Sequence, residues 1–159
     1  MLFESDKEKK LYTVIFIKRE NEVLLGMKKR GFGEGKWNGF GGKVEKNETI
    51  LEGAKRELKE EANIICNDLK NIATIYFEFE IGFEKLMEVH VFTGELFEGE
   101  IIESEEMKPQ WYSIKDIPYE KMWKDDSIWF DSMLKDEKFI AHFRFKDFDT
   151  IIDYKLIKK

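Results

Sequence analysis

Three glutamates are the side chains in this sequence whose types and spacing best suit them to chemistry. Glu57, Glu60 and Glu61 stand at i, i+3 and i+4, so on a helix their carboxylates share a face about one turn long. Like charges at this spacing repel, so the helix gains no stability from the cluster. Oxygen ligands without His or Cys favour Mg²⁺ or Mn²⁺ over zinc. The cluster predicts a divalent-cation site, although a solvated Glu-rich helix with interleaved Lys and Arg fits the triplet alone equally well.

The segment that must carry these glutamates has the pattern of a helix. Residues 49–62 contain no Pro and one Gly. Thr49 followed by Glu52 forms a capping box, in which each side chain satisfies the other residue's free backbone N–H. Apolar residues recur at three- and four-residue steps along one stripe: Ile50, Leu51, Ala54, Leu58 and Ala62. The sequence therefore predicts a helix from about residue 49 to residue 62.

The glutamates also belong to a longer fixed spacing. Gly42 is followed after five residues by Glu48 and after seven more by Arg56-Glu57-Leu58, then by the two remaining glutamates and Asn63-Ile64. This arrangement resembles the signature of the Nudix hydrolases, which cleave a nucleoside diphosphate linked to a further group. One position departs, because the family has Gly where this chain has Asn63. A left-handed helix end suits Gly best and Asn second, so we expect the helix to end there.

Length and composition limit the classes of protein that this chain can form. Its 159 residues suit a single domain, which we assign to residues 1–159. Hydrophobic residues make up 42%, which favours a folded core over disorder. The net charge of −6 argues against a nucleic acid polymer as partner. Cys66 is the sole cysteine, and no apolar run has the length of a membrane span, so we expect a cytoplasmic monomer that binds no membrane.

Alternating apolar residues predict three hairpins around the helix. They are expected at residues 11–17 with 23–27, 75–81 with 87–91, and 139–145 with 151–156. Residues 31–42 hold six glycines and are expected to form a loop. A short strand is expected at 109–112, and a second helix at 128–134, with Ser127 or a preceding Asp as its cap. The charged residues 1–10 are expected to be frayed.

The resemblance extends beyond the helix. The stretches LLGMKKRGFGEGKWNGFGGKV, LMEVHVF, ESEEMKPQW and MWKDDSIWF are similar to the MutT-like oxidised purine nucleoside triphosphatases of mammals, in order, over residues 11–157. This resemblance implies an α/β/α sandwich with a curved mixed sheet between the metal-binding helix and a second helix. It also implies Mg²⁺-dependent hydrolysis of 8-oxo-dGTP, and of 2-hydroxy-dATP, to the monophosphate and pyrophosphate. Such an enzyme keeps oxidised nucleotides out of DNA.

The same resemblance implies roles for particular residues. The metal site would comprise Gly41, Gly42, Glu57, Glu60, Glu61 and Glu106. The four glutamates would form the catalytic group together with Arg56, which would position the helix. The substrate would be bound by Thr13, Lys28, Phe32, Asn38, Phe77, Phe79, Met87, Trp123, Asp125 and Asp126. Lys124 replaces a Pro of the mammalian proteins, which leaves the fine base preference open.

Simpler structural roles exist for most of these residues. The Phe and Met residues suit the core of any sheet, and Trp123 could be an ordinary packing aromatic. Asp125 and Asp126 could merely cap a helix. His90 and His142 lie in alternating segments, and we interpret both as structural.

Other functions also remain open. A Nudix pyrophosphatase acting on ADP-ribose or dinucleoside polyphosphates would show no preference for oxidised purines. A non-catalytic nucleotide-binding module would be expected to lack the box glutamates, which are all present here. A base-reading module appended to an adenine glycosylase would need a partner domain, for which 159 residues leave no room.

Overall fold

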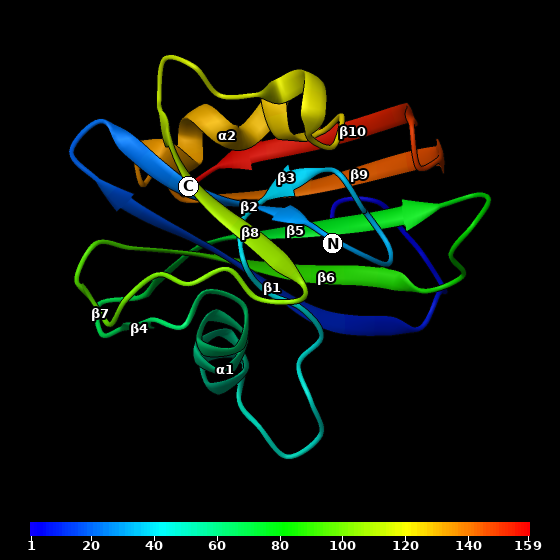
Figure 1. Ribbon diagram of the computed structural model, residues 1–159. Helices are drawn as coiled ribbons and strands as arrows, with labels where there is room; N and C mark the ends of the chain where they lie inside the picture. Colours follow the sequence, from blue (N-terminus) through cyan, green and yellow to red (C-terminus); the bar gives the residue numbers. More distant parts are fainter.

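The computed structural model describes residues 1–159, and a mixed sheet forms its centre (Figure 1). The strands are β1 (Lys9–Arg19), β2 (Glu22–Lys28), β3 (Trp37–Asn38), β4 (Ile65–Cys66), β5 (Lys70–Phe79), β6 (Leu86–Gly94), β7 (Phe97–Glu98), β8 (Met107–Ser113), β9 (Phe139–Asp147) and β10 (Thr150–Lys158). The helices are α1 (Ile50–Ala62) and α2 (Asp126–Leu134), with a 3₁₀ turn at Tyr119–Lys121.

The main sheet has the strand order β10-β9-β5-β6-β1-β2-β3, and β8 pairs with β2. The three predicted hairpins are present as the antiparallel pairs β1–β2, β5–β6 and β9–β10. Two parallel pairings, β1 with β6 and β5 with β9, join these hairpins into one mixed sheet. Strands β4 and β7 form a separate small antiparallel pair.

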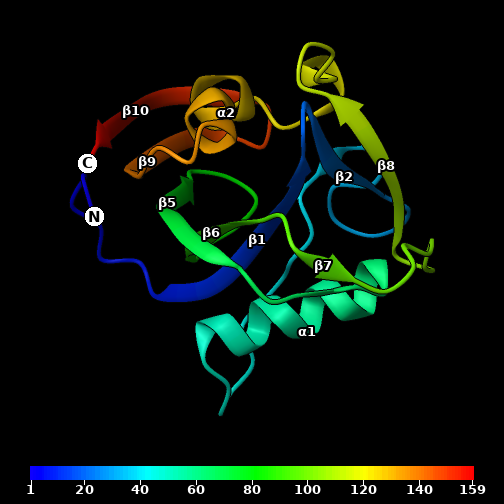
Figure 2. The same cartoon turned by 90° about the vertical axis from the view of Figure 1, so that its left-hand side faces the viewer.

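The two helices cover opposite faces of the sheet, which makes the three-layer sandwich expected from the sequence (Figure 2). Leu58 of α1 belongs to a core cluster with Ile15 and Phe40. Trp129 and Phe130 of α2 belong to a second cluster on the other face. Neither helix combines the length and apolar character needed to span a bilayer.

Helix α1 begins and ends as its local sequence predicts. The Thr49 hydroxyl accepts the Glu52 N–H at 3.1 Å, and the Glu52 carboxylate accepts the Thr49 N–H at 2.7 Å. Asn63 ends the helix in the left-handed conformation, with φ 62° and ψ 27°. Its side chain also donates to the Glu100 carbonyl at 3.0 Å and accepts from Lys59 at 3.2 Å. The Asn therefore makes two contacts that the Gly usual at this position could not.

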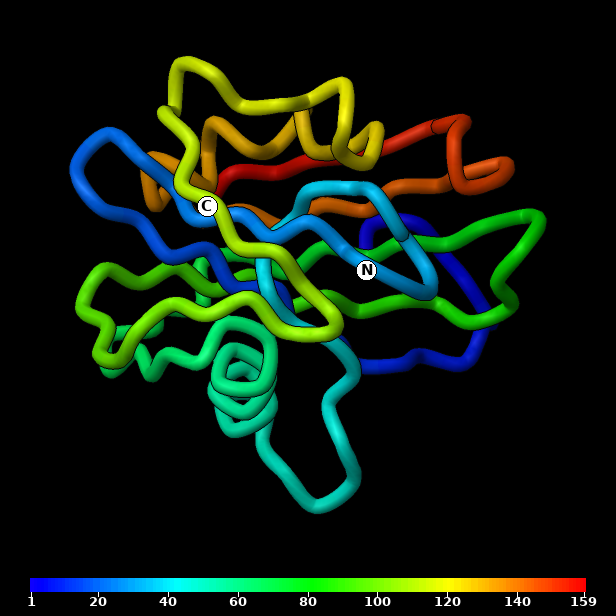
Figure 3. The backbone as a smooth tube through the Cα atoms, viewed as in Figure 1, coloured from blue at the N-terminus to red at the C-terminus, as the bar shows by residue number.

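Three local expectations differ from the structure. The glycine-rich segment is not wholly a loop, because Trp37 and Asn38 pair with β2 as strand β3. Helix α2 starts at Asp126 without any side-chain cap hydrogen bond, so neither a preceding Asp nor Ser127 has the capping role. Residues 1–10, expected to be frayed, are attached: β1 begins at Lys9, and the Phe3 N–H donates to His142 Nδ1 at 3.2 Å. Figure 3 shows this N-terminal path along the sheet.

Candidate active site

A cavity of about 650 Å³ opens between the sheet, the glycine-rich segment and the start of α2. Its volume lies within the range of about 300–1,000 Å³ typical of small-molecule sites. All ten residues that the sequence analysis assigned to substrate binding line this one cavity, although they come from β1, β2, β3, β5, β6, the start of α2 and two loops. The fold thus assembles a set that is scattered over more than a hundred residues of sequence.

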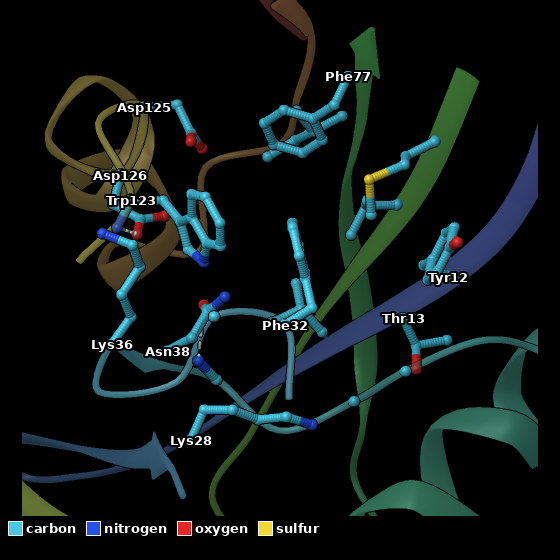
Figure 4. Close-up of a pocket in the computed structure, with 18 of the residues that line it drawn as sticks. Tyr12, Thr13, Lys28, Phe32, Lys36, Asn38, Phe77, Trp123, Asp125 and Asp126 are labelled. Atoms are coloured by element: carbon cyan, nitrogen blue, oxygen red, sulfur yellow. Dashed lines mark hydrogen bonds between the residues drawn. The ribbon is translucent and has the colours of Figure 1, made fainter. Parts of the chain in front are cut away.

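One end of the cavity is aromatic and acidic (Figure 4). Phe32 stacks on Trp123 with ring centroids 5.2 Å apart. Asp125 and Asp126 are 3% and 2% exposed, and both line the cavity. Asp125 Oδ2 accepts the Trp129 Nε1–H at 2.7 Å, and Asp126 Oδ2 accepts the backbone N–H of Trp123 at 3.1 Å. Two acids are therefore buried beside a flat aromatic surface.

Burial changes the protonation of these two acids. It raises the pKa of Asp125 to about 6, against the hydrogen bond from Trp129, which lowers it. It raises the pKa of Asp126 well above its usual range, and the neighbouring Asp125 charge raises it further. Because two adjacent buried carboxylates cannot both ionise cheaply, the pair favours a state that keeps one proton. Such a pair offers both a hydrogen-bond donor and acceptors to a ligand.

The other end of the cavity is polar and includes one hydroxyl group without a hydrogen-bond partner. Thr13 is buried in β1, and its hydroxyl oxygen has no hydrogen-bond partner although it lines the cavity. Lys28 lies at the end of β2, with its Nζ 3.6 Å from Glu106 Oε2. Figure 4 shows both residues at the end away from Asp125. A buried hydroxyl group without a hydrogen-bond partner costs free energy unless a ligand or a water molecule supplies the partner. This end of the cavity is therefore suited to a polar ligand group.

Arg56 organises the exposed side of α1. Its Nε and Nη2 donate to the two oxygens of Glu48 at 3.1 and 2.8 Å, and its Nη1 donates to Glu57 at 3.0 Å and to Glu60 at 3.3 Å. The hydrogen bonds from Arg56 lower the pKa of Glu48. Neither Arg56 nor Glu57 nor Glu60 lines the cavity. These hydrogen bonds tie Glu57 and Glu60 to Glu48, in the loop before the helix.

Glu61 and Glu57 meet the backbone of the glycine-rich segment. The Gly41 N–H donates to Glu61 Oε1 at 2.9 Å, and a Cβ on Gly42 would lie only 2.8 Å from Glu57 Oε1. Burial raises the pKa of the Glu61 carboxyl to about 7, with neighbouring Glu57 adding to the effect, and it raises the pKa of Glu57 as well. The Gly42 carbonyl accepts the N–H of Thr13 at 2.9 Å, which leaves the Gly41 carbonyl the freer of the two.

Glu106, from the loop before β8, faces the same place. Arg30 Nε and Nη2 both donate to its Oε1, at 2.9 and 2.7 Å, and this pairing lowers the pKa of the Glu106 carboxyl. Glu61 and Glu106 both line the cavity. The charge of Glu106 adds to the raised pKa of Glu61, of which burial is the main cause.

The chemistry of this donor set fits a hard divalent cation. Four carboxylates and a backbone carbonyl supply only oxygen ligands. The pKa of Glu61 is raised chiefly by burial and further by the charges of Glu57 and Glu106, and a bound cation would stabilise the ionised form of this carboxyl. In their present rotamers, no three acidic side chains converge as a metal-binding group. Arg56 holds Glu57 and Glu60, and Arg30 holds Glu106, so the protein's own cations neutralise the carboxylates instead.

Sequence reasoning missed several residues that line or support the cavity. Lys36 places its Nζ 5.0 Å from the Trp123 ring and lowers the pKa of Asp126. Arg30 and Tyr12 line the cavity as well. Trp129 lies four residues after Asp125 on α2, a spacing that could have suggested their contact. Nothing local in the sequence marked the other three.

Comparison with known proteins defines the class of protein to which this fold and site belong. The NUDIX domain model matches residues 9–133, and the chain belongs to the Nudix family. Two relatives, from Mus musculus and Danio rerio, are each an oxidized purine nucleoside triphosphate hydrolase, 50% identical over 92% of this chain and 94% of their own length. The crystal structure of the MutT protein from Bacillus halodurans superposes with a TM-score of 0.82 at 26% identity, covering 92% of this chain and 97% of that one.

Proposed function

We propose that this chain hydrolyses oxidised purine nucleoside triphosphates, 8-oxo-dGTP and also 2-hydroxy-dATP, to the monophosphate and pyrophosphate. The observation that carries the proposal is the cavity, in which two fully buried acids with raised pKa values stand beside Trp123. The 50% identity to two hydrolases of oxidised purine nucleotides supports the same substrate class.

The acidic end would read the base. A purine edge presents hydrogen-bond donors and acceptors together, and two ionised carboxylates can only accept. A proton shared by Asp125 and Asp126 supplies the missing donor, and its relocation would let one pocket take either an oxidised guanine or an oxidised adenine. Trp123 and Phe32 would provide the aromatic stacking surface, with Asn38 beside them and Phe77, Phe79 and Met87 as apolar walls.

The polar end would hold the triphosphate. Lys28 offers an ammonium group, and the unpartnered hydroxyl of Thr13 offers a hydrogen bond. A triphosphate arriving there would compete with Glu106 for Arg30 and Lys28, since both cations presently pair with that carboxylate. Substrate binding would thus free Glu106.

Glu57, Glu60, Glu61 and Glu106, with the Gly41 or Gly42 carbonyl, would hold Mg²⁺ or its substitute Mn²⁺. When bound, the ion would neutralise phosphate charge and lower the pKa of a coordinated water. Arg56 would keep Glu57 and Glu60 in place through its hydrogen bonds to them. The Gly41 N–H would fix the orientation of Glu61.

We further propose that the chain works as a cytoplasmic monomer in which residues 1–159 form one domain. The mixed sheet running from β10 to β3 and covered on both faces supports a single folding unit. The net charge of −6 supports a free nucleotide, rather than a nucleic acid polymer, as the substrate. Light scattering after size exclusion tests the oligomeric state.

Pyrophosphate release from a panel of nucleotides with Mg²⁺ tests the reaction. The panel comprises 8-oxo-dGTP, 2-hydroxy-dATP, dGTP and dATP, together with ADP-ribose and a dinucleoside polyphosphate assayed for monophosphate release. We expect the two oxidised triphosphates to have the highest kcat/KM. Equal turnover of oxidised and normal purines, or preference for ADP-ribose, would assign a different Nudix specificity. Binding without hydrolysis of any of them would indicate a nucleotide-binding module.

A further inference from the structure

Phe148, in the turn between β9 and β10, touches three of the aromatic residues that line the cavity without lining it itself. Its ring centroid lies 4.9 Å from Phe32, 4.9 Å from Phe79 and 6.4 Å from Trp123. The contacts with Phe32 and Trp123 are edge-to-face, at interplanar angles of 72° and 70°. Edge-to-face pairs at these distances are attractive and directional.

The three contacted residues belong to different segments. Phe32 lies in the glycine-rich segment, Phe79 ends β5, and Trp123 precedes α2. Phe32 is 61% exposed, so little else restrains its ring besides Trp123 and Phe148. A single side chain therefore links three parts of the cavity wall that share no local sequence.

The neighbouring β5–β6 turn is shaped to receive this ring. Gly82 has φ +104°, and a Cβ built on it would lie 2.6 Å from Phe148 Cε2. Figure 3 shows the β5–β6 and β9–β10 turns at the same end of the molecule. Only glycine leaves room for Phe148 in its present position, so the two turns fit each other through this contact.

We propose that Phe148 is a positioning residue for base binding, which holds Phe32 and Trp123 in the orientation that accepts an oxidised purine. The inference rests on the proposed function, since it concerns the same cavity. Truncating Phe148 would remove the edge contacts, and Phe32 would then reorient over Trp123 and Phe79. The bound base would have to restore that order at the cost of affinity.

Titration calorimetry of 8-oxo-dGMP binding, without metal, tests the positioning role of Phe148 separately from the chemical step. We expect Phe148→Ala to raise the Kd about tenfold, and Phe148→Leu, which keeps apolar bulk without a ring, to raise it about threefold. Phe97→Ala is the matched control, because Phe97 is also half-buried and packs against Trp111 away from the cavity. The control should lower Tm as Phe148→Ala does but leave the Kd unchanged.

Gly82→Ala tests the position of the Phe148 ring without changing Phe148 itself. Its added methyl group would displace the Phe148 ring, so the Kd should rise as it does in Phe148→Ala. Gly99→Ala is its control, since Gly99 has nearly the same φ, +102°, but lies next to Asn63. In turnover assays with 8-oxo-dGTP, a positioning role raises KM about tenfold in both Phe148→Ala and Gly82→Ala and leaves kcat within about twofold.

The outcomes separate the inference from the proposed function. A wild-type protein that binds 8-oxo-dGMP no better than dGMP overturns the proposed function and the inference with it. If wild type prefers 8-oxo-dGMP over dGMP, and Phe148→Ala and Phe148→Leu both bind 8-oxo-dGMP as tightly as wild type does, the inference alone is overturned. Equal weakening in Phe97→Ala would also overturn it, because the loss would then follow from general destabilisation. If Phe148→Ala does not fold, Phe148→Leu and Gly82→Ala decide.

Discussion

Replacing Asp125 by Asn should stabilise the protein at neutral pH. Asp125 is 3% exposed, and burial raises its pKa to about 6 from an ordinary 3.8. A change of that size corresponds to about 3 kcal/mol between the two protonation states. Asn is nearly the same shape, cannot ionise, and keeps an oxygen to accept the Trp129 Nε1–H. The substitution therefore removes a buried charge while retaining the hydrogen bond.

The sign of the pH dependence follows from the raised pKa. Between about pH 4 and pH 6, the native Asp125 holds its proton while the unfolded one has lost it, so stability falls as pH rises through this window. The Asp125→Asn variant has no carboxyl at this position, so its stability does not fall in this way. We expect the free energy of unfolding of Asp125→Asn to equal that of wild type near pH 4 and to exceed it by about 1–3 kcal/mol above pH 6. The range extends below 3 kcal/mol because the titration belongs to the pair, and Asp126 can hold the proton in place of Asp125.

Urea unfolding at a series of pH values measures the difference directly. The control is Asp131→Asn, on the same helix, whose side chain is 76% exposed and paired with Lys135. Its difference from wild type measures the effect of the same Asp-to-Asn change at an exposed position of α2. If Asp125→Asn differs from wild type by a constant amount, or is less stable above pH 6, the carboxyl is not held protonated by burial. Asp125→Asn and Asp126→Asn should also change the ratio of 8-oxo-dGTP to 2-hydroxy-dATP hydrolysis, by different amounts.

Three further predictions concern the glutamate site. Glu61→Gln should keep the fold, measured by Tm, and lower kcat by two or more orders of magnitude at saturating Mg²⁺, and near-normal turnover would contradict the metal assignment. Gly42→Ala should lower kcat about a hundredfold, because its Cβ would lie 2.8 Å from Glu57 Oε1 and displace that carboxylate; unchanged kcat would show that the carboxylate can move without consequence. Arg30→Ala should tighten Mn²⁺ binding by nucleotide-free protein about three- to tenfold, because it frees Glu106 and removes a nearby positive charge. Electron paramagnetic resonance titrations measure this affinity, and weaker binding would refute the idea that Arg30 competes with the metal for Glu106.

Much of the fold could be read from local sequence. The capping box at Thr49 and the left-handed end at Asn63 depend on residues within four positions of each other, and both are present. The hairpins follow from strict alternation of apolar residues, which fixes the buried face of each strand. The parallel pairings of β1 with β6 and β5 with β9 join distant segments, and only the resemblance to a known family pointed to a mixed sheet.

The site divides in the same way. The sequence by itself determined the carboxylate face of α1, because Glu57, Glu60 and Glu61 must share one face of any helix that carries them. Only the tertiary structure decided that Arg30 pairs with Glu106, that Asp125 is buried deeply enough to raise its pKa, and that Phe148 meets Phe32. The physical reason is that helical spacing is set by hydrogen bonds between near neighbours, whereas burial and charge pairing depend on how segments far apart in the chain pack together.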